Sequence, residues 1–596
     1  MIDTLTLRNF KAFSEEVSAR LADLVVLAGA NSSGKTSLLQ AILLLSQTLE
    51  NSRRDVVLDL GGPLVQFAEF RDVVFGRPPN SQARFSVGFH LSLNEPDLLQ
   101  MLAQAPEDTA ESLRRSRLSS SRPSLRFSSS LRSELPRPSR IELTFGATNN
   151  GRPLVHSLVL QKDFIDAHSV THRIESLGRK YRATITNTPT KPRNQREITR
   201  FAKQIASHVL RLSETGLSPS ADPSLRSRPS LSSIVDKLLV FQGLGWDPNL
   251  ESLTPLRAAL AATKTPLWRY AAPGLALDFG QICSDIVRLV ASIPMERSLL
   301  LPLAFDHFFP GASASYREID PRTDVYLNSF VALFGDAIVD VRRYLRSIEY
   351  VGPLRAKPER AYLPSGTPPD IGRSGENAVP ILWLEQQSKV LTKSRLGAVS
   401  TRKRLGTAVQ EWFEEFGVAQ SLHVTSPKRV IYQATLDGPP RSGTRVTIAD
   451  VGIGVSQLLP VVVSGLRAQP GATIVLEQPE IHLHPRIQAK LADFLLVLVE
   501  LEKRVIVETH SEHLINALRL RVAEDPSGGL QNKLSILFVQ GQDLEDTTSR
   551  PGSRLSSLEV DAYGHVVNWP EDFFPEYADM NERLLTAMIA RARKKR

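Results

Sequence analysis

Cysteine is almost absent from this sequence. Its 596 residues include a single cysteine, Cys283. One thiol cannot build an internal disulfide framework or a multi-cysteine metal site, and a lone cysteine is most often a buried, unreactive side chain. The composition therefore argues against redox chemistry as the function.

Long apolar runs are absent as well. The run FLLVLVEL at residues 494–501 is far shorter than the ~20 apolar residues that a transmembrane helix needs. The opening residues, MIDTLTLRNFKAF, lack the basic and then apolar pattern of a secretion signal. We therefore expect a cytoplasmic protein with no membrane partner. At this length, 42% hydrophobic and 23% charged residues predict a globular protein of two or more domains.

Positive charge is concentrated in two segments. Residues 111–140 contain 8 Arg and 2 Glu, and the tail RARKKR at 591–596 adds five basic residues, whereas the whole chain has a formal net charge of +9. Arginines that contact phosphates favour nucleic-acid binding. However, Phe127 is the one aromatic residue in the first segment, which gives bases little to stack on. A solvated, disordered loop at about 103–138 is an equally good interpretation.

The apolar pattern predicts an α/β core that is interrupted in the sequence. A strand, a glycine-rich turn and a helix are expected at residues 23–50, and alternating strands and helices return after residue 346. Between them, strand-like segments separated by turns suggest an antiparallel meander, at residues 83–93, 140–147, 154–161 and 181–186. Helical patterns follow at 197–212 and 279–293, without the sustained heptads of a long coiled coil.

A phosphate-binding loop is the strongest motif in the chain. Gly29, Gly34, Lys35 and Thr36 satisfy the pattern G-x-x-x-x-G-K-[ST] between a strand and a helix. Backbone N–H groups of such a loop hold phosphate oxygens, the lysine reaches the terminal phosphates, and the threonine hydroxyl can bind Mg²⁺. We therefore expect ATP and Mg²⁺ as ligands. The predicted loop contacts are Gly29, Asn31, Ser32, Ser33, Gly34, Lys35, Thr36 and Ser37.

An acidic strand end supplies the second part of the expected site. The apolar run before Glu477 ends in the sequence Glu477, Gln478, Pro479, Glu480. A nucleotide hydrolase needs a carboxylate here to hold Mg²⁺ and a group that positions water. We expect Thr36 and Glu477 to be the metal ligands.

These motifs resemble the ABC-type ATPase heads of the structural-maintenance-of-chromosomes (SMC) and overcoming-lysogenization-defect (OLD) branch, and more narrowly the prokaryotic AAA-labelled ATPases of that branch. The resemblance rests on the stretches LTLRNFKAF, GANSSGKTSLLQAI, VGPLRAKPERAY, DVGIGVSQLLPVV and VETHSEHLI. The ending DAYGHVVNWPEDFF is similar to a small C-terminal domain of unknown function. The likeness covers roughly residues 1–90 and 346–596.

The resemblance implies an α/β fold: an ABC-type P-loop NTPase head split in sequence, with an antiparallel β lobe and an inserted, mainly helical arm. The domain prediction that follows places the N-terminal part of the head and the β lobe at 1–190 and the helical insertion at 191–345. The C-terminal part of the head follows at 346–540, and a small domain with the basic tail occupies 541–596.

The resemblance also implies a site shared between two heads. One subunit would supply the phosphate loop and the acidic strand, and the other would present Gly452, Gly454 and Ser456 to the γ-phosphate. By the same resemblance His510 is the switch histidine. A glycine-rich turn at the start of a helix suits an anion because the helix dipole points its positive end there. A helix capped by Ser456 explains the same residues equally well.

One residue departs from the family pattern. The position after the metal-binding acid, normally a glutamate that acts on water, is Gln478. Glutamine can orient a water molecule but cannot take its proton, so either hydrolysis is slow or Glu480 substitutes. The predicted catalytic residues are therefore Glu477, Gln478, Glu480 and His510.

The histidines near the acidic strand offer an alternative interpretation. His482 and His484 would share one side of an extended strand, and His510 and His513 one helical face, which is an arrangement that can bind a metal. We favour the nucleotide site, because the resemblance already places these segments beside the nucleotide.

Three functions are compatible with these features. The preferred one is an ATP-gated homodimer or higher oligomer that senses or acts on nucleic acid, in a defence system against foreign DNA, with a separate nuclease-like effector. The second is an OLD-like nuclease, for which Asp543, Glu545 and Asp546 are candidate acids, although Gln540 stands where a glutamate is expected. The third is a transport ATPase, which VGIGVSQ disfavours because it differs from the transporter signature LSGGQ.

Overall fold

The structure is a computed structural model that divides into two compact units. It describes residues 2–51, 56–91, 136–164, 168–176, 181–189, 195–214, 254–262, 295–301, 337–363, 368, 370–418, 421–427, 431–437, 445–541 and 552–568. The head unit comprises Thr4–Val87, Gly146–Leu154 and Arg342–Arg596, and the β-lobe unit comprises Met1–Asp3, Gly88–Phe145 and Val155–Val341. The described residues do not include Cys283, most of the arginine-rich segment at 111–140, the acids at 543–546 or the basic tail at 591–596.

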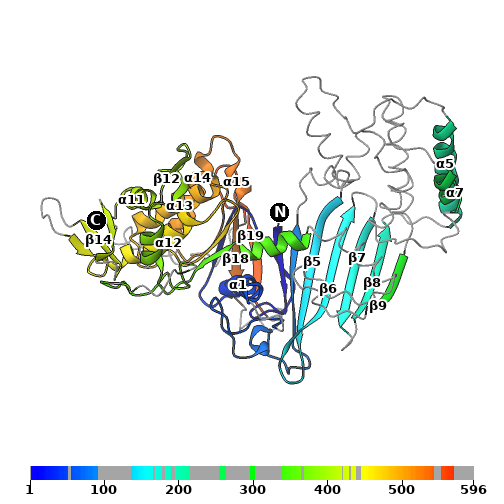
Figure 1. Ribbon diagram of the computed structural model, residues 1–596, viewed down its shortest axis with the longest axis horizontal. Helices are drawn as coiled ribbons and strands as arrows, with labels where there is room; N and C mark the ends of the chain where they lie inside the picture. Colours follow the sequence, from blue (N-terminus) through cyan, green and yellow to red (C-terminus); the bar gives the residue numbers. More distant parts are fainter. Residues whose placement is uncertain are drawn as a thin grey trace, which may run out of the picture. The chain divides into compact units, whose positions relative to one another are not determined.

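A six-stranded sheet forms the centre of the head unit (Figure 1). Its strands, in spatial order, are β10 (Ile348–Val351), β16 (Thr473–Glu477), β17 (Arg504–Glu508), β3 (Leu24–Gly29), β18 (Leu534–Gln540) and β19 (Arg554–Leu558). The first five strands are parallel, and β19 is an antiparallel edge strand. Segments from both ends of the chain thus complete one sheet, which confirms the split α/β head.

The chemistry of the strands explains the parallel sheet. Each residue of β16 is buried, as are the first five of β3, and the interior of both strands is a continuous apolar run, Ile474–Leu476 in β16 and Leu24–Ala28 in β3. Such runs suit parallel strands that are covered on both faces. Because parallel strands share one carboxyl edge, the phosphate loop after β3 and the acidic ends of β16 and β17 come to the same side of the sheet.

Helices follow the strands of the head unit. The predicted helix after the phosphate loop is confirmed with the expected bounds, α1 (Lys35–Glu50). Helix α13 (Pro485–Glu500) follows the acidic strand and has proline in its first turn, where no N–H is needed. The other helices of the head unit are α10 (Ala378–Glu385), α11 (Leu405–Phe416), α12 (Ile453–Arg467), α14 (Glu512–Glu524), α15 (Leu530–Lys533) and the short 3-10 helix η1 (Phe70–Val73).

Two small sheets complete the described part of the head unit. One is the antiparallel pair β11 (Lys389–Thr392) and β12 (Thr401–Arg404). The other has three antiparallel strands, β13 (Leu422–Thr425), β14 (Gln433–Asp437) and β15 (Arg445–Thr447). Strand β19 belongs to the central sheet of the head, although the sequence assigns its residues to a separate C-terminal domain. The other predicted domain boundaries stay predictions.

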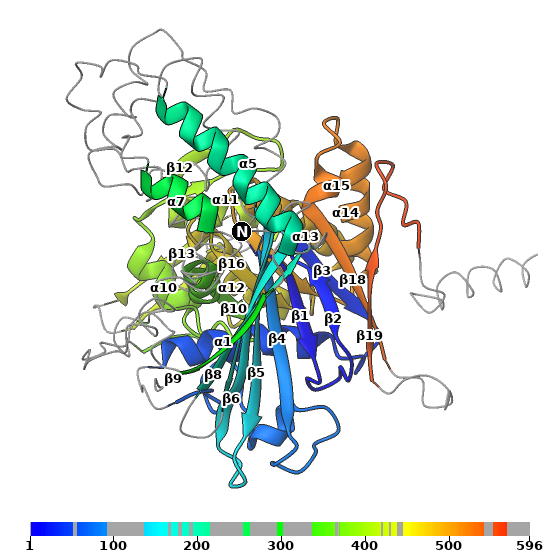
Figure 2. The ribbon, with the colours of Figure 1, turned by 90° about the vertical axis from the view of Figure 1, so that its right-hand side faces the viewer.

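An eight-stranded sheet contains the predicted meander. Its order is β2-β1-β4-β5-β6-β7-β8-β9, so the strands from β4 onward follow the chain, and β5 to β9 lie side by side (Figures 1 and 2). The strands are β1 (Ile2–Arg8), β2 (Val17–Arg20), β4 (Arg84–Leu91), β5 (Pro136–Ala147), β6 (Pro153–Phe164), β7 (His168–Ser176), β8 (Tyr181–Pro189) and β9 (Met295–Leu301). This confirms the antiparallel β lobe.

The structure changes two details of the inserted regions. Strand β5 starts at Pro136, so the last residues of the loop expected at 103–138 belong to a strand. Strand β9 lies within the segment expected to be mainly helical. Its described helical parts are α5 (Gln195–Glu214), α7 (Thr254–Ala262) and residues 337–346, while residues 279–293 lie outside the described part.

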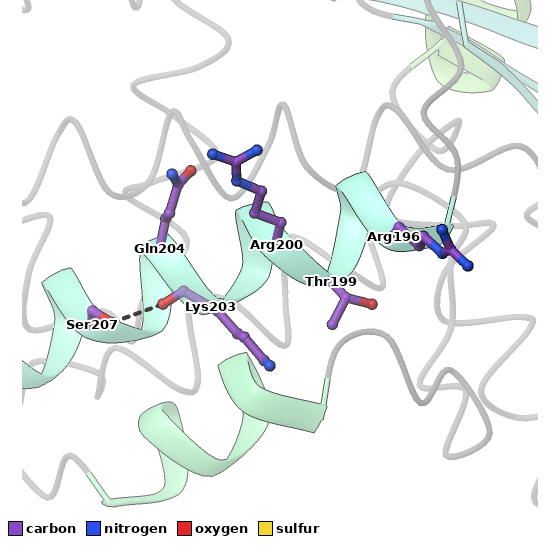
Figure 3. Close-up of a pocket in the computed structure, with 6 residues that line it drawn as sticks. All are labelled: Arg196, Thr199, Arg200, Lys203, Gln204 and Ser207. Carbon is purple, nitrogen blue, oxygen red and sulfur yellow. Dashed lines mark hydrogen bonds between the residues drawn. The ribbon is translucent and has the colours of Figure 1, made fainter.

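Helix α5 of the β-lobe unit is strongly amphipathic. Ile198, Ala202 and Ile205 are buried on one face. The other face borders a cavity of about 780 Å³ lined by side chains that project from successive turns (Figure 3), namely Arg196, Thr199, Arg200, Lys203, Gln204 and Ser207. In the described part of the chain, no helix is long and apolar enough to span a bilayer.

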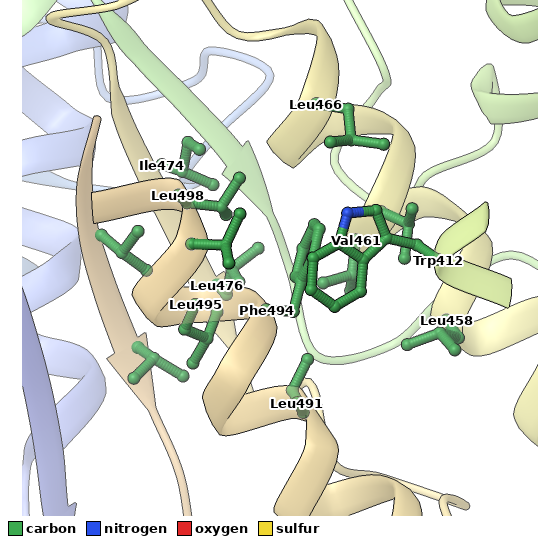
Figure 4. Close-up of a cluster of buried hydrophobic side chains, with 14 of the residues drawn as sticks. Trp412, Leu458, Val461, Leu466, Ile474, Leu476, Leu491, Phe494, Leu495 and Leu498 are labelled. Carbon is green, nitrogen blue, oxygen red and sulfur yellow. The ribbon is translucent and has the colours of Figure 1, made fainter. Parts of the chain in front are cut away.

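The core of the head unit is centred on Trp412 of α11 (Figure 4). Its indole ring meets the Phe494 ring of α13 edge-on, with ring centroids 4.9 Å apart. Leu458 and Val461 of α12 belong to the same buried cluster. Three helices that are far apart in sequence are thereby packed together, which fixes α12 and α13 relative to the sheet.

Candidate functional site

The phosphate loop has the backbone geometry that its glycines predict. Gly29 has a φ of +142°, and a Cβ atom there would lie 2.3 Å from the carbonyl oxygen of Val539 in β18, so only glycine fits. The N-cap of α1 is Gly34, which leaves the first turn without a side-chain cap. Asn31 and Ser32 are exposed, whereas Ser33 and Ser37 are buried. An uncapped helix start next to a tight loop is a suitable anion site.

Lys35 is folded back into the loop. Its Nζ donates to the carbonyl oxygens of Gly29 and Ala30 at 3.1 and 2.6 Å. Burial lowers the pKa of Lys35, while the carboxylates of Glu508 and Glu480 act in the opposite direction. The ammonium group is thus held within the loop that it is expected to share with phosphate oxygens.

Glu477 lies at the end of β16 and is almost fully buried. Its Oε1 accepts a hydrogen bond of 2.8 Å from the Tyr350 hydroxyl. Its backbone oxygen accepts from Nη1 of Arg355 at 2.9 Å, and burial raises the pKa of its carboxyl. Two other guanidinium nitrogens of Arg355 are buried without a partner among the described residues, and burial lowers its pKa to about 10. Arg355 therefore stays charged at neutral pH, and two of its guanidinium nitrogens make no described hydrogen bond.

Gln478 and Glu480, which the sequence treats as alternatives, have different positions. Gln478 has a φ of +46°, donates its backbone N–H to the carbonyl oxygen of Glu508 at 2.7 Å, and lines the cavity at the strand ends. Glu480 instead accepts a 2.7 Å hydrogen bond from the backbone N–H of His510 and does not line that cavity. Its burial raises its pKa. Glu480 thus holds the switch-histidine segment, and Gln478 faces the open space.

A second contact joins the segment around His510, the predicted switch histidine, to the loop that follows the acidic strand, residues 478–483. Gln488 of α13 donates to the carbonyl oxygen of Leu483 at 2.9 Å and accepts from the Ser511 hydroxyl at 2.7 Å. Ser511 also caps α14 by accepting from the N–H of Leu514. His510 is half-buried, and burial together with the charge of Lys35 lowers its pKa. His510 is therefore expected to be neutral at physiological pH.

Glu508 is a site residue that the sequence interpretation missed. It ends β17, is 3% exposed, and accepts a hydrogen bond of 3.1 Å from the Thr36 hydroxyl. Burial, followed by the nearby charge of Glu477, raises its pKa to about 7. The rule that selects Glu477, a carboxylate at the carboxyl end of an apolar strand, selects Glu508 in RVIVETHS as well.

Two cavities flank the start of α1. The first, of about 460 Å³, is lined by Thr36, Gln40, Leu64, Val65, Gln66, Tyr350, Pro353, Arg373, Glu477, Gln478 and Glu508. The second, of about 580 Å³, is lined by Lys11, Ala12, Ser32, Gly34, Thr36, Ser37, Gln40, Asp72, Val74, Gly76 and Arg77. Both volumes are in the range of small-molecule sites, and they meet at Thr36. A phosphate chain on the loop would therefore have space on both sides.

The donor set fits Mg²⁺. The first cavity holds a hydroxyl from Thr36 and carboxylates from Glu477 and Glu508, all oxygen ligands. Oε2 of Glu508 is buried without a partner among the described residues. Hard oxygen ligands of this kind, with water and phosphate oxygens, are what Mg²⁺ prefers.

The predicted signature residues occupy the start of α12. The N-cap is Gly452, not a serine, and Ser456 donates its hydroxyl to the carbonyl oxygen of Ile453 at 2.7 Å. Ser456 is buried, whereas Gly452 and Ile453 are exposed. Neither cavity beside the phosphate loop is lined by a residue of α12. The helix-cap interpretation of Ser456 is therefore wrong, and the exposed turn stays a candidate surface for a second head.

The histidine pattern does not form an extended strand. His482 has a φ of +61° in a turn, and His484 caps α13 through a 3.2 Å bond from the N–H of Arg486 to its Nδ1. Among the described residues, no group of three or more His, Cys, Asp or Glu side chains is arranged to hold a metal. The premise that HLH presents both imidazoles from one strand face is therefore incorrect.

Comparison with known families supports the head assignment. The family model described as "AAA ATPase domain" matches residues 1–79 and 389–515. These segments include the phosphate loop, the α12 turn, the acidic strand and His510. The chain is thus similar to an AAA ATPase domain over two separate segments, which agrees with a head that is split in sequence; the match does not reach the C-terminal segment.

Solved structures give weaker similarities. One is the Smc head domain of Pyrococcus furiosus, which has an extended coiled coil and is bound to the C-terminal domain of ScpA. It is 11% identical to this chain, the match covers 94% of this chain and 96% of that chain, and the TM-score is 0.33. The SMC head domain of Thermotoga maritima shares 8% identity over 94% and 99% of the two chains, with a TM-score of 0.30. No curated protein matches the chain.

Proposed function

We propose that this ATPase head binds ATP with Mg²⁺ at the phosphate loop, hydrolyses it slowly, and uses the bound state to close two heads against each other. The observation that carries the proposal is the 460 Å³ cavity, where Thr36, Glu477 and Glu508 meet but the side chain beside Glu477 is the amide of Gln478. Oxygens that could bind the metal line this cavity, and the residue after Glu477 carries an amide where a carboxylate base would be expected.

The residues then have separate tasks. Lys35 and the α1 N-terminus bind phosphate oxygens, and Arg355 contributes positive charge beside Glu477. Thr36 and Glu477 hold Mg²⁺, which stabilises the charge that develops on the transferred phosphoryl group. Gln478 orients a water molecule by hydrogen bonding without removing its proton. Glu480 fixes the backbone at His510, so that the switch segment responds to the acidic loop.

Head closure is supported by the exposed start of α12. Gly452 and Ile453 lie at the helix N-terminus, which has no side-chain cap, and Ile453 is 48% exposed. A large exposed apolar side chain suits burial in an interface with a partner. The positively polarised end of a helix without a side-chain cap suits contact with a phosphate that the partner carries.

The test is ATP-dependent dimerisation, measured by light scattering with ATP and Mg²⁺. Ile453→Glu should prevent the dimer, because its carboxylate favours the helix dipole in the monomer but repels the partner's γ-phosphate. Leu520→Glu, at another exposed apolar position on α14, is the matched control and should dimerise normally. Equal dimerisation of both variants would refute the composite site.

We also propose that the assembly acts on nucleic acid, in a defence system and with a separate effector. The cations on one face of α5, Arg196, Arg200 and Lys203, support this proposal, because they line one cavity and could neutralise phosphates there. Substituting all three by Gln, or deleting residues 111–135, should weaken binding and reduce the slope of log affinity against log salt. An unchanged slope in both variants would contradict it.

The alternatives make different predictions. An OLD-like nuclease would cleave DNA without another protein in the presence of Mg²⁺, and a transport ATPase would require a membrane partner. We expect the purified protein to do neither. The cytoplasmic location stays a prediction.

A further inference from the structure

Two glutamates end neighbouring parallel strands in the head unit. Glu477 of β16 and Glu508 of β17 are direct partners in the strand register. They are 4% and 3% exposed, so neither carboxylate has bulk water to stabilise its charge. Two buried like charges at one point of a sheet are unfavourable unless a cation or further hydrogen bonds compensate them.

The hydrogen bonds of this pair are incomplete. Glu477 accepts from the Tyr350 hydroxyl at 2.8 Å, and Glu508 accepts from the Thr36 hydroxyl at 3.1 Å through Oε1. Oε2 of Glu508 is buried and has no partner among the described residues. Thr36, Glu477 and Glu508 line the same cavity of about 460 Å³. The unpaired oxygen therefore belongs to a group that borders open space next to a second carboxylate.

We propose that Glu508 is a further ligand of the divalent cation, so that the metal site consists of the Thr36 hydroxyl and the carboxylates of both Glu477 and Glu508. This deepens the proposed function and rests on it. Mg²⁺ commonly takes one or two carboxylates together with phosphate oxygens and retained waters, and the second carboxylate here comes from the strand between the acidic strand and the phosphate-loop strand. The structural alternative is that Glu508 only orients the Thr36 hydroxyl.

Glu480 is the other acid near this site, and its geometry is different. Its Oε1 is engaged by the backbone N–H of His510, and its Oε2 is also buried without a partner among the described residues, but its side chain does not line the cavity. Glu508 is therefore the better candidate for the second metal ligand.

The experiment is a titration with Mn²⁺, followed by electron paramagnetic resonance, of the full chain in the presence of a non-hydrolysable ATP analogue. Glu508→Gln should weaken Mn²⁺ binding about 10-fold or more, because even residues behind metal ligands contribute about 10- to 100-fold. Affinity for the analogue in EDTA should be unchanged or higher, since the variant removes a negative charge near the phosphates. Glutamine can still accept from Thr36, which preserves the local fold.

Glu349→Gln is the matched control. Glu349 is a largely buried glutamate on β10 of the same sheet, but it contacts Ser464 and Arg467 away from the cavity. This variant should bind Mn²⁺ as the wild type does. Equal Mn²⁺ affinity of wild type and Glu508→Gln, with the analogue bound by both, would overturn the inference and leave Glu508 as an orienting group for Thr36.

A Mn²⁺ titration without nucleotide separates the two proposals. If the wild type binds no analogue at all, the proposed function is wrong. The carboxylate pair should then still bind Mn²⁺ weakly, and loss of this binding in Glu508→Gln would support the metal site. No difference between the two proteins in that titration would refute it.

Discussion

Replacing Gln478 by glutamate should turn a slow switch into a faster enzyme. The side chain lines the cavity beside Glu477, and its left-handed backbone, with φ at +46°, is equally strained for either residue. Basal turnover of the wild type should be on the order of one per minute or less, against ~10 s⁻¹ for a typical enzyme. The substitution adds a carboxylate directly after Glu477, at the position where the wild type has an amide that cannot take a proton from water.

The size of the effect follows from two opposing contributions. A correctly placed general base contributes about 10²- to 10⁴-fold, which lowers the barrier by about 2.7–5.4 kcal/mol. However, Glu477 and Glu508 are nearby, and a third carboxylate would have a raised pKa and be partly protonated. We therefore expect a gain at or below the low end of that range, about 10- to 100-fold. Gln478→Met, which removes the water-orienting amide at similar volume, should lower the rate.

The assay is steady-state phosphate release by the purified chain at saturating ATP and Mg²⁺. Glu480→Gln is the decisive comparison, because the amide oxygen that it introduces can keep the hydrogen bond from the His510 N–H. This variant should change turnover by less than about threefold if Glu480 only positions that segment. If Glu480→Gln abolishes hydrolysis while Gln478→Glu leaves it unchanged, Glu480 is the base and our assignment is wrong. Wild-type turnover of several per second would contradict the premise itself.

Three further predictions concern the head. Lys35→Ala should abolish the thermal stabilisation by ATP, whose size follows RT ln(1 + [L]/Kd); an unchanged shift in melting temperature would exclude the phosphate loop as the binding site. Burial lowers the pKa of Lys503 from its ordinary 10.5 to about 8. Below pH 8 the buried ammonium is charged and lowers the free energy of unfolding. Between about pH 8 and 10.5 the folded protein releases this proton before the unfolded chain does, so the free energy of unfolding rises. In urea titrations the free energy of unfolding of the wild type should therefore rise by about 1.4 kcal/mol between pH 7 and 9, relative to that of Lys503→Met. The same pH dependence in both proteins would disprove this prediction. Trp412→Ala should cost about 3–5 kcal/mol and Trp412→Phe under ~1.5 kcal/mol, because Nε1 of Trp412 makes no described hydrogen bond; similar losses for both would mean that the ring is not a packing residue.

Sequence reasoning correctly placed the helices and strands whose residue pattern is contained in one short, continuous stretch of the chain. The helix α1 has the predicted bounds because its glycine-rich start, lysine and apolar spacing are all contiguous. The meander of the β lobe likewise has strands that follow the chain, although β7 is too polar for the alternation to be recognised. Strand β9 pairs with β8 from more than a hundred residues away in sequence, and no local pattern encodes that pairing.

The candidate site was only half predictable, for a related reason. Lys35, Thr36 and Glu477 follow from motifs, but the adjacency of Glu508 depends on parallel pairing of β17 with both β16 and β3. The roles of Gln478 and Glu480 depend on a turn in which residues two apart point in different directions. His482 shows the same limit, because its left-handed φ breaks the two-residue alternation that a strand would give.

Gly454 lies very close to the loop that follows the acidic strand, residues 478–482. This contact joins the exposed start of α12 to the loop that begins at the nucleotide cavity. A Cβ atom at Gly454 would lie 2.7 Å from the carbonyl oxygen of His482, so the first turn of α12 rests directly on the chain that follows Gln478. A shift of residues 478–482 would therefore press directly on that turn. If nucleotide binding moved this loop, the exposed start of α12 would move with it, and the occupancy of one subunit's cavity would be felt at the surface proposed to meet the partner.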